Sequence, residues 1–325
     1  MRLLFIRFSA IGDIVLASPA LRCAKQQIPG VEIHFLTKKS MKAVTEANPY
    51  VDHFHYFEND LTATIQELKA FSFDYIIDLH KNLRSLRIRK ALGVPYLSYN
   101  KLSVEKFLLT KFGVNRMPER HISLRSVDTL SPLGVTYDGK GLDYFVPSGT
   151  SEPSFFPGGY VALVIGASYF TKKLPLDSLK VVCSQIPYPI VLVGGKEEKA
   201  DGDELALLDP ARIVNTCGTY SLHESALIVS KAREVISHDT GMLYIACAFD
   251  KNVIAIWGAT SPALQVEPLM PSESSARVFQ SIVPDLSCQP CSNFGTKTCP
   301  KGHFDCMKKQ DLPEIIRKVE EMWDV

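Results

Sequence analysis

The chain has 325 residues, enough for two domains that each bury a core. Hydrophobic residues make up 46% and charged residues 22%, an ordinary globular composition that excludes disordered, collagen-like and coiled-coil chains. The net charge of +1 gives no overall field to attract nucleic acid, and no apolar run reaches the roughly 18 residues of a membrane span.

The first half alternates short apolar runs with longer helical patterns, which is typical of βα units around a parallel sheet. The pattern predicts strands at 3–8, 31–36, 53–57 and 74–79, and helices at 14–27, 41–47 and 61–71. A stretch rich in Pro, Gly and Ser follows at 147–159. We expect it to link two domains.

The second half repeats the alternation. It predicts strands at 160–165, 190–193, 212–214, 234–236 and 253–257, and helices at 176–185, 197–208, 222–231, 240–249 and 312–323. We therefore predict an α/β protein with domains at 1–150 and 151–310, and a C-terminal helical segment at 311–325 that packs back on the first domain. Open sheets of this kind bind ligands at the carboxyl ends of their strands, here in a cleft between two domains.

The first predicted strand leads through small residues into a helix, in the segment Arg7-Phe8-Ser9-Ala10-Ile11-Gly12-Asp13. Such a turn presents backbone N–H groups and a helix N-terminus. From this segment alone, Asp13 is either a helix cap or a functional carboxylate. The G-x-G-x-x-G spacing of dinucleotide sites is absent, which argues against a nicotinamide-dependent oxidoreductase.

The second domain carries comparable segments after its strands. Gly166-Ala167-Ser168 follows the first of them, and Lys172-Lys173-Leu174-Pro175 precedes the next helix. His238-Asp239-Thr240-Gly241 ends a later strand and begins a helix, leaving N–H groups that suit a phosphate.

Together, five segments in this order resemble glycosyltransferase family 9, the heptosyltransferase-like enzymes of lipopolysaccharide core assembly: residues 8–13, 172–175, 221–224, 239–241 and 258–262. The resemblance extends over nearly the whole chain. It implies a GT-B fold of two Rossmann-like domains facing each other across a cleft, with the acceptor on the N-terminal domain and a nucleotide-sugar donor on the C-terminal one. It also implies transfer with inversion and without a catalytic metal or other required cofactor.

The resemblance assigns a role to each matching position. Asp13 matches the general base, and the donor side matches Ser168 and Lys172 near the diphosphate, Glu224 near the ribose, and Asp239, Thr240 and Gly241 in the phosphate-binding turn. The family often reads Asp-Thr-Gly-Leu-x-His, whereas Tyr244 stands here at the position of the histidine. We expect ADP-heptose as the donor. A nucleotide-sugar epimerase of the same architecture and a non-catalytic nucleotide-sugar-binding protein are the alternatives.

Basic residues are concentrated between His80 and Arg125, a segment that contains eleven Lys or Arg and only two acidic residues. Part of this segment follows a strand, where ligands bind in open α/β sheets. We expect a phosphorylated, lipid-linked saccharide acceptor to be bound by Gly12, His80, Lys81, Asn82, Arg84 and Arg120. The same charges suit an anionic membrane surface, which predicts a cytoplasmic enzyme, peripheral at the inner face of the membrane.

Four of the eight cysteines form a C-x₂-C-x₇-C-x₆-C pattern at Cys288, Cys291, Cys299 and Cys306. With no export signal we expect free thiols or metal ligands, and zinc is one interpretation of this set. Similar Cys-rich stretches occur in the second-heptose branch of the family, where the resemblance implies a structural role without a metal. The other four cysteines lie in apolar contexts and are expected to fill the core.

Overall fold

A computed structural model of the chain describes residues 1–323. Residues 324 and 325, the end of the segment predicted at 311–325, lie outside the described residues. The chain forms two compact units. The first unit contains 1–101, 120–147 and 271–273, and the second contains 102–119, 148–270 and 274–325.

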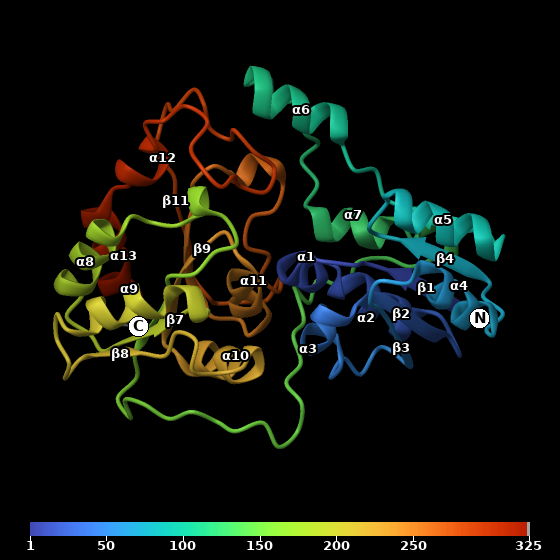
Figure 1. Cartoon of the computed structure of the whole chain (residues 1–325), viewed down its shortest axis with the longest axis horizontal. Helices are drawn as coiled ribbons and strands as arrows, with labels where there is room; N and C mark the ends of the chain where they lie inside the picture. Colours follow the sequence, from blue (N-terminus) through green and yellow to red (C-terminus); the bar gives the residue numbers. More distant parts are fainter. Residues whose placement is uncertain (324–325) are drawn as a thin grey trace. The chain divides into compact units, whose positions relative to one another are not determined.

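The first unit is a parallel five-stranded sheet with helices, in the order β3-β2-β1-β4-β5 (Figure 1). Its strands are β1 (Arg2–Ile6), β2 (Glu32–Lys38), β3 (His53–Phe57), β4 (Tyr75–Asp78) and β5 (Tyr96–Ser98). Its helices are α1 (Ile11–Leu16), α2 (Ser18–Gln27), α3 (Lys42–Thr45), α4 (Leu61–Lys69), α5 (Leu83–Leu92) and α7 (Ile122–Asp128).

The continuous apolar run of β1 is buried on both faces of this sheet. Leu4 and Ile6 lie in one core cluster with Leu68 of α4 and Ile88 of α5. Side chains two residues apart in a strand share a face, so these contacts place α4 and α5 on the same side of the sheet. The helix predicted at 14–27 is in fact two helices, because the chain restarts at Ala17 with Pro19 in the first turn of α2.

The second unit is a parallel six-stranded sheet in the order β11-β10-β9-β6-β7-β8. Its strands are β6 (Val161–Val164), β7 (Ile190–Val193), β8 (Ile213–Asn215), β9 (Glu234–His238), β10 (Asn252–Ile256) and β11 (Val278–Ser281). Its helices are α6 (Ser103–Phe112), α8 (Leu176–Gln185), α9 (Lys199–Ala206), α10 (Leu222–Lys231), α11 (Gly241–Ala248), α12 (Asp305–Lys308) and α13 (Leu312–Trp323). The predicted α/β class with two parallel sheets is thus confirmed.

Two helices belong to a different unit from the one the sequence predicted. The helix α13 was expected on the first domain, but its apolar face (Ile315, Ile316, Val319 and Met322) completes the core of the second unit. The helix α6 lies within the first 150 residues yet belongs to the second unit. Leu102, Leu109 and Met117 pack there against Leu264, because only that face of α6 buries apolar surface.

None of the helices in the described residues is both long enough and apolar enough to cross a bilayer.

Candidate functional site

Asp13 lies where β1 has ended and α1 begins, at the carboxyl edge of the first sheet. Its Oδ2 accepts a hydrogen bond from the Ala10 N–H at 3.0 Å, and its Oδ1 lies 2.7 Å from Nη2 of Arg7. Burial alone would raise the pKa of Asp13, but Arg7 and the Ala10 N–H outweigh it and hold that pKa below its usual value. The side chain is 28% exposed, so an ionised carboxylate is presented to solvent.

Arg7 holds Asp13 in this orientation and was not singled out from the sequence. Its guanidinium is almost buried and donates to the carbonyl oxygens of Ser9 at 3.1 Å and Leu79 at 2.5 Å. These two bonds hold Nε and Nη1 of the guanidinium, so the remaining nitrogen, Nη2, meets the carboxylate in one geometry. The sequence did contain a signal, because Arg7 stands directly after the apolar run of β1.

The segment after β4 brings His80, Lys81, Asn82 and Arg84 to the same edge. The His80 ring packs edge-on against Phe8 at 5.1 Å, which joins it to the turn that carries Asp13. Burial, with the charges of Arg7 and Lys101, lowers the pKa of His80 to about 4, so it is neutral at neutral pH.

The remaining residues of this segment have structural partners of their own. The Asn82 side chain caps α5 by accepting from the N–H groups of Arg84 and Ser85. The Arg84 guanidinium lies over the Phe57 ring at 4.8 Å, and Nζ of Lys81 is 3.5 Å from the Tyr99 carbonyl oxygen. Cation–π contact leaves the edge of the Arg84 guanidinium available to an anion.

Beside Arg84 the surface is hollowed over about 560 Å³. The lining comes from the ends of β2 and β3 and includes Lys38, Lys39, Ser40 and Phe57. Lys39 is paired with Glu58 at 2.5 Å. This contribution was not predicted from the sequence, although Lys38, Lys39 and Ser40 come soon after an apolar run and so mark a strand end.

Arg120 does not join this group through any contact among the described residues. It forms an ion pair with Asp128 at 2.6 Å on the surface beside α7. Gly12 lies in the first turn of α1, next to Asp13.

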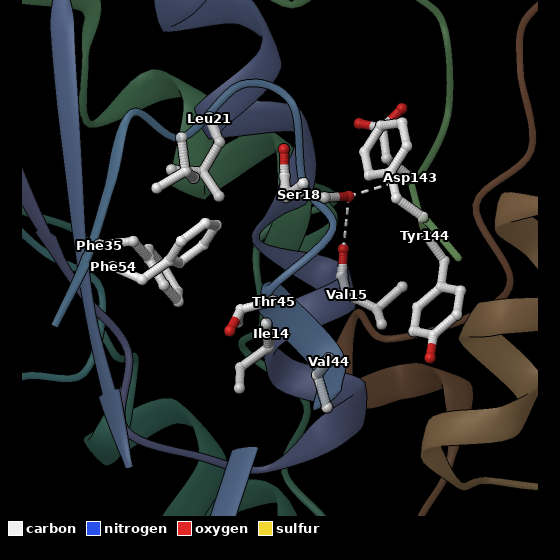
Figure 2. Close-up of a pocket in the computed structure, with 13 residues that line it drawn as sticks. Ile14, Val15, Ser18, Leu21, Phe35, Val44, Thr45, Phe54, Asp143 and Tyr144 are labelled. Carbon is white, nitrogen blue, oxygen red and sulfur yellow. Dashed lines mark hydrogen bonds between the residues drawn. The ribbon is translucent and has the colours of Figure 1, made fainter. Parts of the chain in front are cut away.

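A second pocket in the first unit lies behind α1 and is mainly apolar (Figure 2). Ile14, Val15 and Leu21 line one part of it, and Ser18 donates to the Val15 carbonyl oxygen at 2.7 Å. Asp143, also in the lining, forms an ion pair with Arg22. Ile14, the residue after Asp13, belongs to this lining, so the pocket adjoins the start of α1.

In the second unit, Asp239 follows β9 and collects three polar partners. Its Oδ2 lies 2.7 Å from Nζ of Lys172 and accepts from Oγ1 of Thr260 at 2.7 Å, while its Oδ1 lies 2.9 Å from the Tyr244 hydroxyl. The carboxylate is 6% exposed, so these contacts replace its hydration. The result is that Lys172 is fixed at the carboxyl ends of β6 and β9.

Tyr244 occupies the position where the family often has a histidine. It is buried, and besides Asp239 its hydroxyl lies 2.9 Å from the Val266 carbonyl oxygen. The phenol thus links the turn after β9 to the segment near residue 266. Tyr244 therefore holds the Asp239 carboxylate through its hydroxyl.

His238 holds the lysine segment from the other side. Its Nε2 accepts from the Leu174 N–H at 2.9 Å, and burial together with Lys173 lowers its pKa to about 3. A neutral ring is needed to accept that bond. Lys173 turns away from Lys172 and pairs with the buried Glu198.

The other predicted donor residues sit at two helix starts and one loop. The Thr240 hydroxyl caps α11, an eight-residue helix that begins at Gly241. Glu224 forms a capping box with Ser221 at the start of α10, and the Ser221 N–H lowers its pKa. Ser168 is exposed in the loop after β6. Thr240 and Gly241 adjoin Asp239 in the chain, whereas no hydrogen bond or ion pair among the described residues joins Glu224 or Ser168 to Lys172.

The N-terminal parts of β2 and β3 carry the described residues' tightest group of metal-type ligand atoms, from Glu32, His34 and His53. Oε1 of Glu32 lies 3.0 Å from Nε2 of His34 and 3.2 Å from Nε2 of His53. The two rings stack at 4.5 Å and 27°, and both Nε2 atoms contact the same carboxylate oxygen of Glu32. Arg2 forms an ion pair with the same carboxylate.

Comparison with known proteins agrees with this architecture. The sequence profile described as "Glycosyltransferase family 9 (heptosyltransferase)" matches residues 61–297. Lipopolysaccharide heptosyltransferase 1 of Pseudomonas aeruginosa is 22% identical over 96% of this chain and 93% of its own length. Lipooligosaccharide heptosyltransferase 2 of Haemophilus influenzae is 29% identical over 23% of each chain.

Solved structures share the fold. A glycosyltransferase of family 9 from Veillonella parvula superposes with a TM-score of 0.76 at 17% identity, covering 99% of this chain and 97% of that one. The E. coli heptosyltransferase WaaC with ADP gives a TM-score of 0.70 at 18% identity, covering 99% and 100%. The fold is therefore GT-B, and the chain belongs to glycosyltransferase family 9, the heptosyltransferases, which makes it a glycosyltransferase.

Proposed function

We propose that the protein transfers heptose from ADP-heptose to an anionic acceptor of the lipopolysaccharide core, with inversion and without a catalytic metal. The family assignment and the heptosyltransferase names of the relatives support the sugar and the acceptor. The ADP bound to the E. coli relative supports the nucleotide. The observation that carries the proposal is an ionised, solvent-reachable Asp13 at the carboxyl edge of the first sheet.

In this reaction an acceptor hydroxyl oxygen attacks the anomeric carbon while the bond from that carbon to the diphosphate oxygen breaks. The hydroxyl proton passes to Asp13. The low pKa of Asp13 makes it a weak base at rest, so proton transfer occurs as attack makes the hydroxyl acidic. Negative charge then develops on the departing ADP, which Lys172 stabilises.

The donor is proposed to bind the second unit. Lys172 contacts the diphosphate and is kept in place by Asp239, while the capped start of α11 at Thr240 and Gly241 offers N–H groups to a phosphate. Ser168 and Glu224 are proposed to complete the donor contacts.

The acceptor is proposed to bind the first unit. Its anionic groups would meet Arg84 and Lys38 at the 560 Å³ hollow, beside Lys81, His80 and Asn82. Arg120 and Gly12 remain proposed acceptor residues. Phosphate is a fitting partner for an arginine held flat against an aromatic ring, because the guanidinium edge stays free to donate.

Substituting the proposed base tests this function. We expect Asp13→Asn to lower kcat by about 10² to 10⁴ while ADP binding is unchanged, because general-base removal typically costs this much. Asp60→Asn is a matched control, because Asp60 also caps a helix of the first unit and asparagine caps equally well. Near-normal turnover of Asp13→Asn would show that another group takes the proton.

Nucleotide preference is tested by thermal shift with ADP, UDP, GDP and their sugar conjugates. Selective stabilisation by ADP and ADP-heptose supports the donor. A selective response to UDP would move the donor assignment elsewhere.

We further propose that the enzyme works at the cytoplasmic face of an anionic membrane. On α6 and just after it, Val104, Phe107 and Phe112 are 68%, 52% and 66% exposed, among the basic residues Lys111 and Arg116. Exposed apolar side chains interspersed with lysine are typical of helices that lie in a lipid interface.

Co-sedimentation with vesicles tests this location. We expect the protein to pellet with vesicles containing anionic phospholipid, to be released by salt, and to lose binding in Val104→Ser/Phe107→Ser. Leu207→Ser is the control, because Leu207 is 76% exposed on a different helix end. Equal binding by both variants, or no binding by the unaltered protein, would contradict the proposal.

A further inference from the structure

Glutamate and histidine side chains form a cluster near the amino-terminal ends of β2 and β3. Glu32 and His34 stand two residues apart in β2, and His53 and His55 stand two residues apart in β3. Side chains with this spacing share a face of the sheet, and the register pairs His34 with His53 across the two strands. Two regular, adjacent strands therefore position the cluster.

Three ligand atoms of the cluster have the spacing of a metal site. Oε1 of Glu32 lies 3.0 Å from Nε2 of His34 and 3.2 Å from Nε2 of His53. One ligand atom from each of the three residues lies within 4.8 Å of the other two. Zinc binds nitrogen and oxygen at about 2.0 to 2.1 Å, so the ligand atoms of a tetrahedral site are about 3.3 Å apart. The two oxygen–nitrogen distances match this value closely.

A line of three hydrogen-bond contacts runs through the cluster from Glu32 to a second glutamate. After the contact between Glu32 and His34, Nδ1 of His34 lies 2.8 Å from Nε2 of His55, and Nδ1 of His55 lies 2.5 Å from Oε1 of Glu67 in α4. Each contact needs one proton, whereas two neutral imidazole rings supply only two. A third proton would place an imidazolium charge on rings that are 0% and 3% exposed, and burying a charge is costly.

We propose that Glu32, His34 and His53 bind one divalent transition-metal ion, for which zinc is the best match. The ion takes the lone pair of Nε2 of His34 in place of a proton. Nδ1–H of His34 then donates to His55, and Nδ1–H of His55 donates to Glu67, so both rings are neutral and every contact is satisfied. Metal-binding histidines almost always donate their other ring N–H to an outer partner in this way. Two imidazoles and a carboxylate are a donor set that zinc accepts.

The surroundings of the three ligands orient them and leave one side open. Arg2 pairs with Oε2 of Glu32 at 2.8 Å, so Oε1 remains directed at the two rings. The Phe71 ring packs edge-on against the buried His34 ring at 4.7 Å. The His53 side chain is 48% exposed, so an ion enters from this side and keeps a water molecule as its fourth ligand.

The place of the cluster in the sheet gives the ion a structural role. His34 stands four residues before Lys38, which lines the hollow beside Arg84, and this separation is about 13 Å at 3.3 Å per residue. The ion joins β2 to β3 directly and reaches α4 through His55 and Glu67. Because the unfolded chain does not assemble these ligands, binding stabilises the folded first unit. This role does not depend on the reaction proposed above.

Zinc titration of the full chain tests the site without any transfer assay. With reduced protein freed of metal by a chelator, we expect calorimetry to show one equivalent of zinc whose affinity falls more than about 100-fold in Glu32→Gln and in His53→Ala. Glu67→Ala removes only the outer partner, at a side chain that is 53% exposed, and should weaken this binding by about 10- to 100-fold. Glu46→Gln is the matched control, because it removes an equal charge from an exposed glutamate of the first unit and should leave zinc affinity unchanged.

Cobalt(II) distinguishes this site from the C-terminal cysteines. Cobalt held by nitrogen and oxygen gives visible bands without the near-ultraviolet absorption of cobalt–thiolate bonds, and we expect these bands to disappear in His53→Ala. Because His53 is half-exposed, circular dichroism should show this variant folded, with a Tm that zinc no longer raises. Three results would overturn the proposal: no binding of zinc or cobalt by the unaltered chain, unchanged affinity in both Glu32→Gln and His53→Ala, or a cobalt spectrum of thiolate ligands alone.

Discussion

Glu234 makes the stability of the second unit depend on pH. It is the first residue of β9, is fully buried, and neither carboxylate oxygen has a hydrogen-bond partner among the described residues. Burial raises the pKa of Glu234 to about 8 from an ordinary value of 4.5. The folded protein therefore keeps the proton at neutral pH, whereas the unfolded chain releases it.

The sign and size of the effect follow from linkage. Between pH 4.5 and 8 the unfolded state binds fewer protons than the folded state, so the free energy of unfolding falls as pH rises. The stabilisation that the protonated Glu234 carboxyl group contributes is fully present below pH 4.5 and is lost by about pH 8. At about 1.4 kcal/mol per pKa unit, the loss by pH 8 is on the order of 3 to 5 kcal/mol. Glu234→Gln keeps the shape and removes the titration.

Urea unfolding at pH 6, 7, 8 and 9, followed by tryptophan fluorescence, measures this loss. The chain has two tryptophans, Trp257 and Trp323, and both lie in the second unit, so the signal reports that unit alone. The unaltered protein should lose stability with pH more steeply than Glu234→Gln, whose own buried amide affects all pH values equally. Parallel slopes for the two proteins would refute the reasoning.

Three further predictions concern the residues that hold Lys172 and Asp13 in place. Asp239→Asn weakens the hold on Lys172, so we expect at least a several-fold weaker ADP affinity by calorimetry, and unchanged affinity would contradict this role. Gly295 has φ +92°, and a Cβ there would lie 2.8 Å from Cβ of Tyr169 and 2.9 Å from Cγ of Lys172. For Gly295→Ala we therefore expect a loss of about 1 to 3 kcal/mol in urea unfolding, and an unaltered midpoint would refute it. Arg7→Met should raise the pKa of Asp13 and move the acid limb of kcat/KM to higher pH, whereas Arg7→Lys should move it less.

Much of the fold could be predicted because buried parallel strands are continuous apolar runs. The strands at residues 3–6, 161–164 and 190–193 consist of such runs and were predicted within a few residues. The short strands β5 and β11 were missed because their residues are only partly buried. The unit to which α6 belongs depends on its contact with Leu264, more than 140 residues away, which local periodicity does not encode.

The sequence named residues of the candidate site that lie in short local segments, whereas it did not indicate those that depend on distant partners. Asp13 and Asp239 follow strand ends, Lys172 precedes α8, and the structure joins Lys172 to Asp239. The partner of Asp13, Arg7, stands in the same segment but went unnoticed because its anchors include the distant Leu79 carbonyl. Buried cysteines outside the C-terminal set, such as Cys183 and Cys247, were correctly predicted as core residues.

The chain leaves the first unit at residue 102 and returns to it at residue 120. A fragment starting at Ser148 would therefore lack α6. The apolar side chains near Leu264 would then be exposed to water, because the residues on and beside α6 that cover them would be missing. Dividing the chain at the linker would therefore leave an exposed apolar helix on the N-terminal half and an exposed apolar patch on the C-terminal half. A C-terminal piece made for separate study therefore needs the 18 residues 102–119 attached to it.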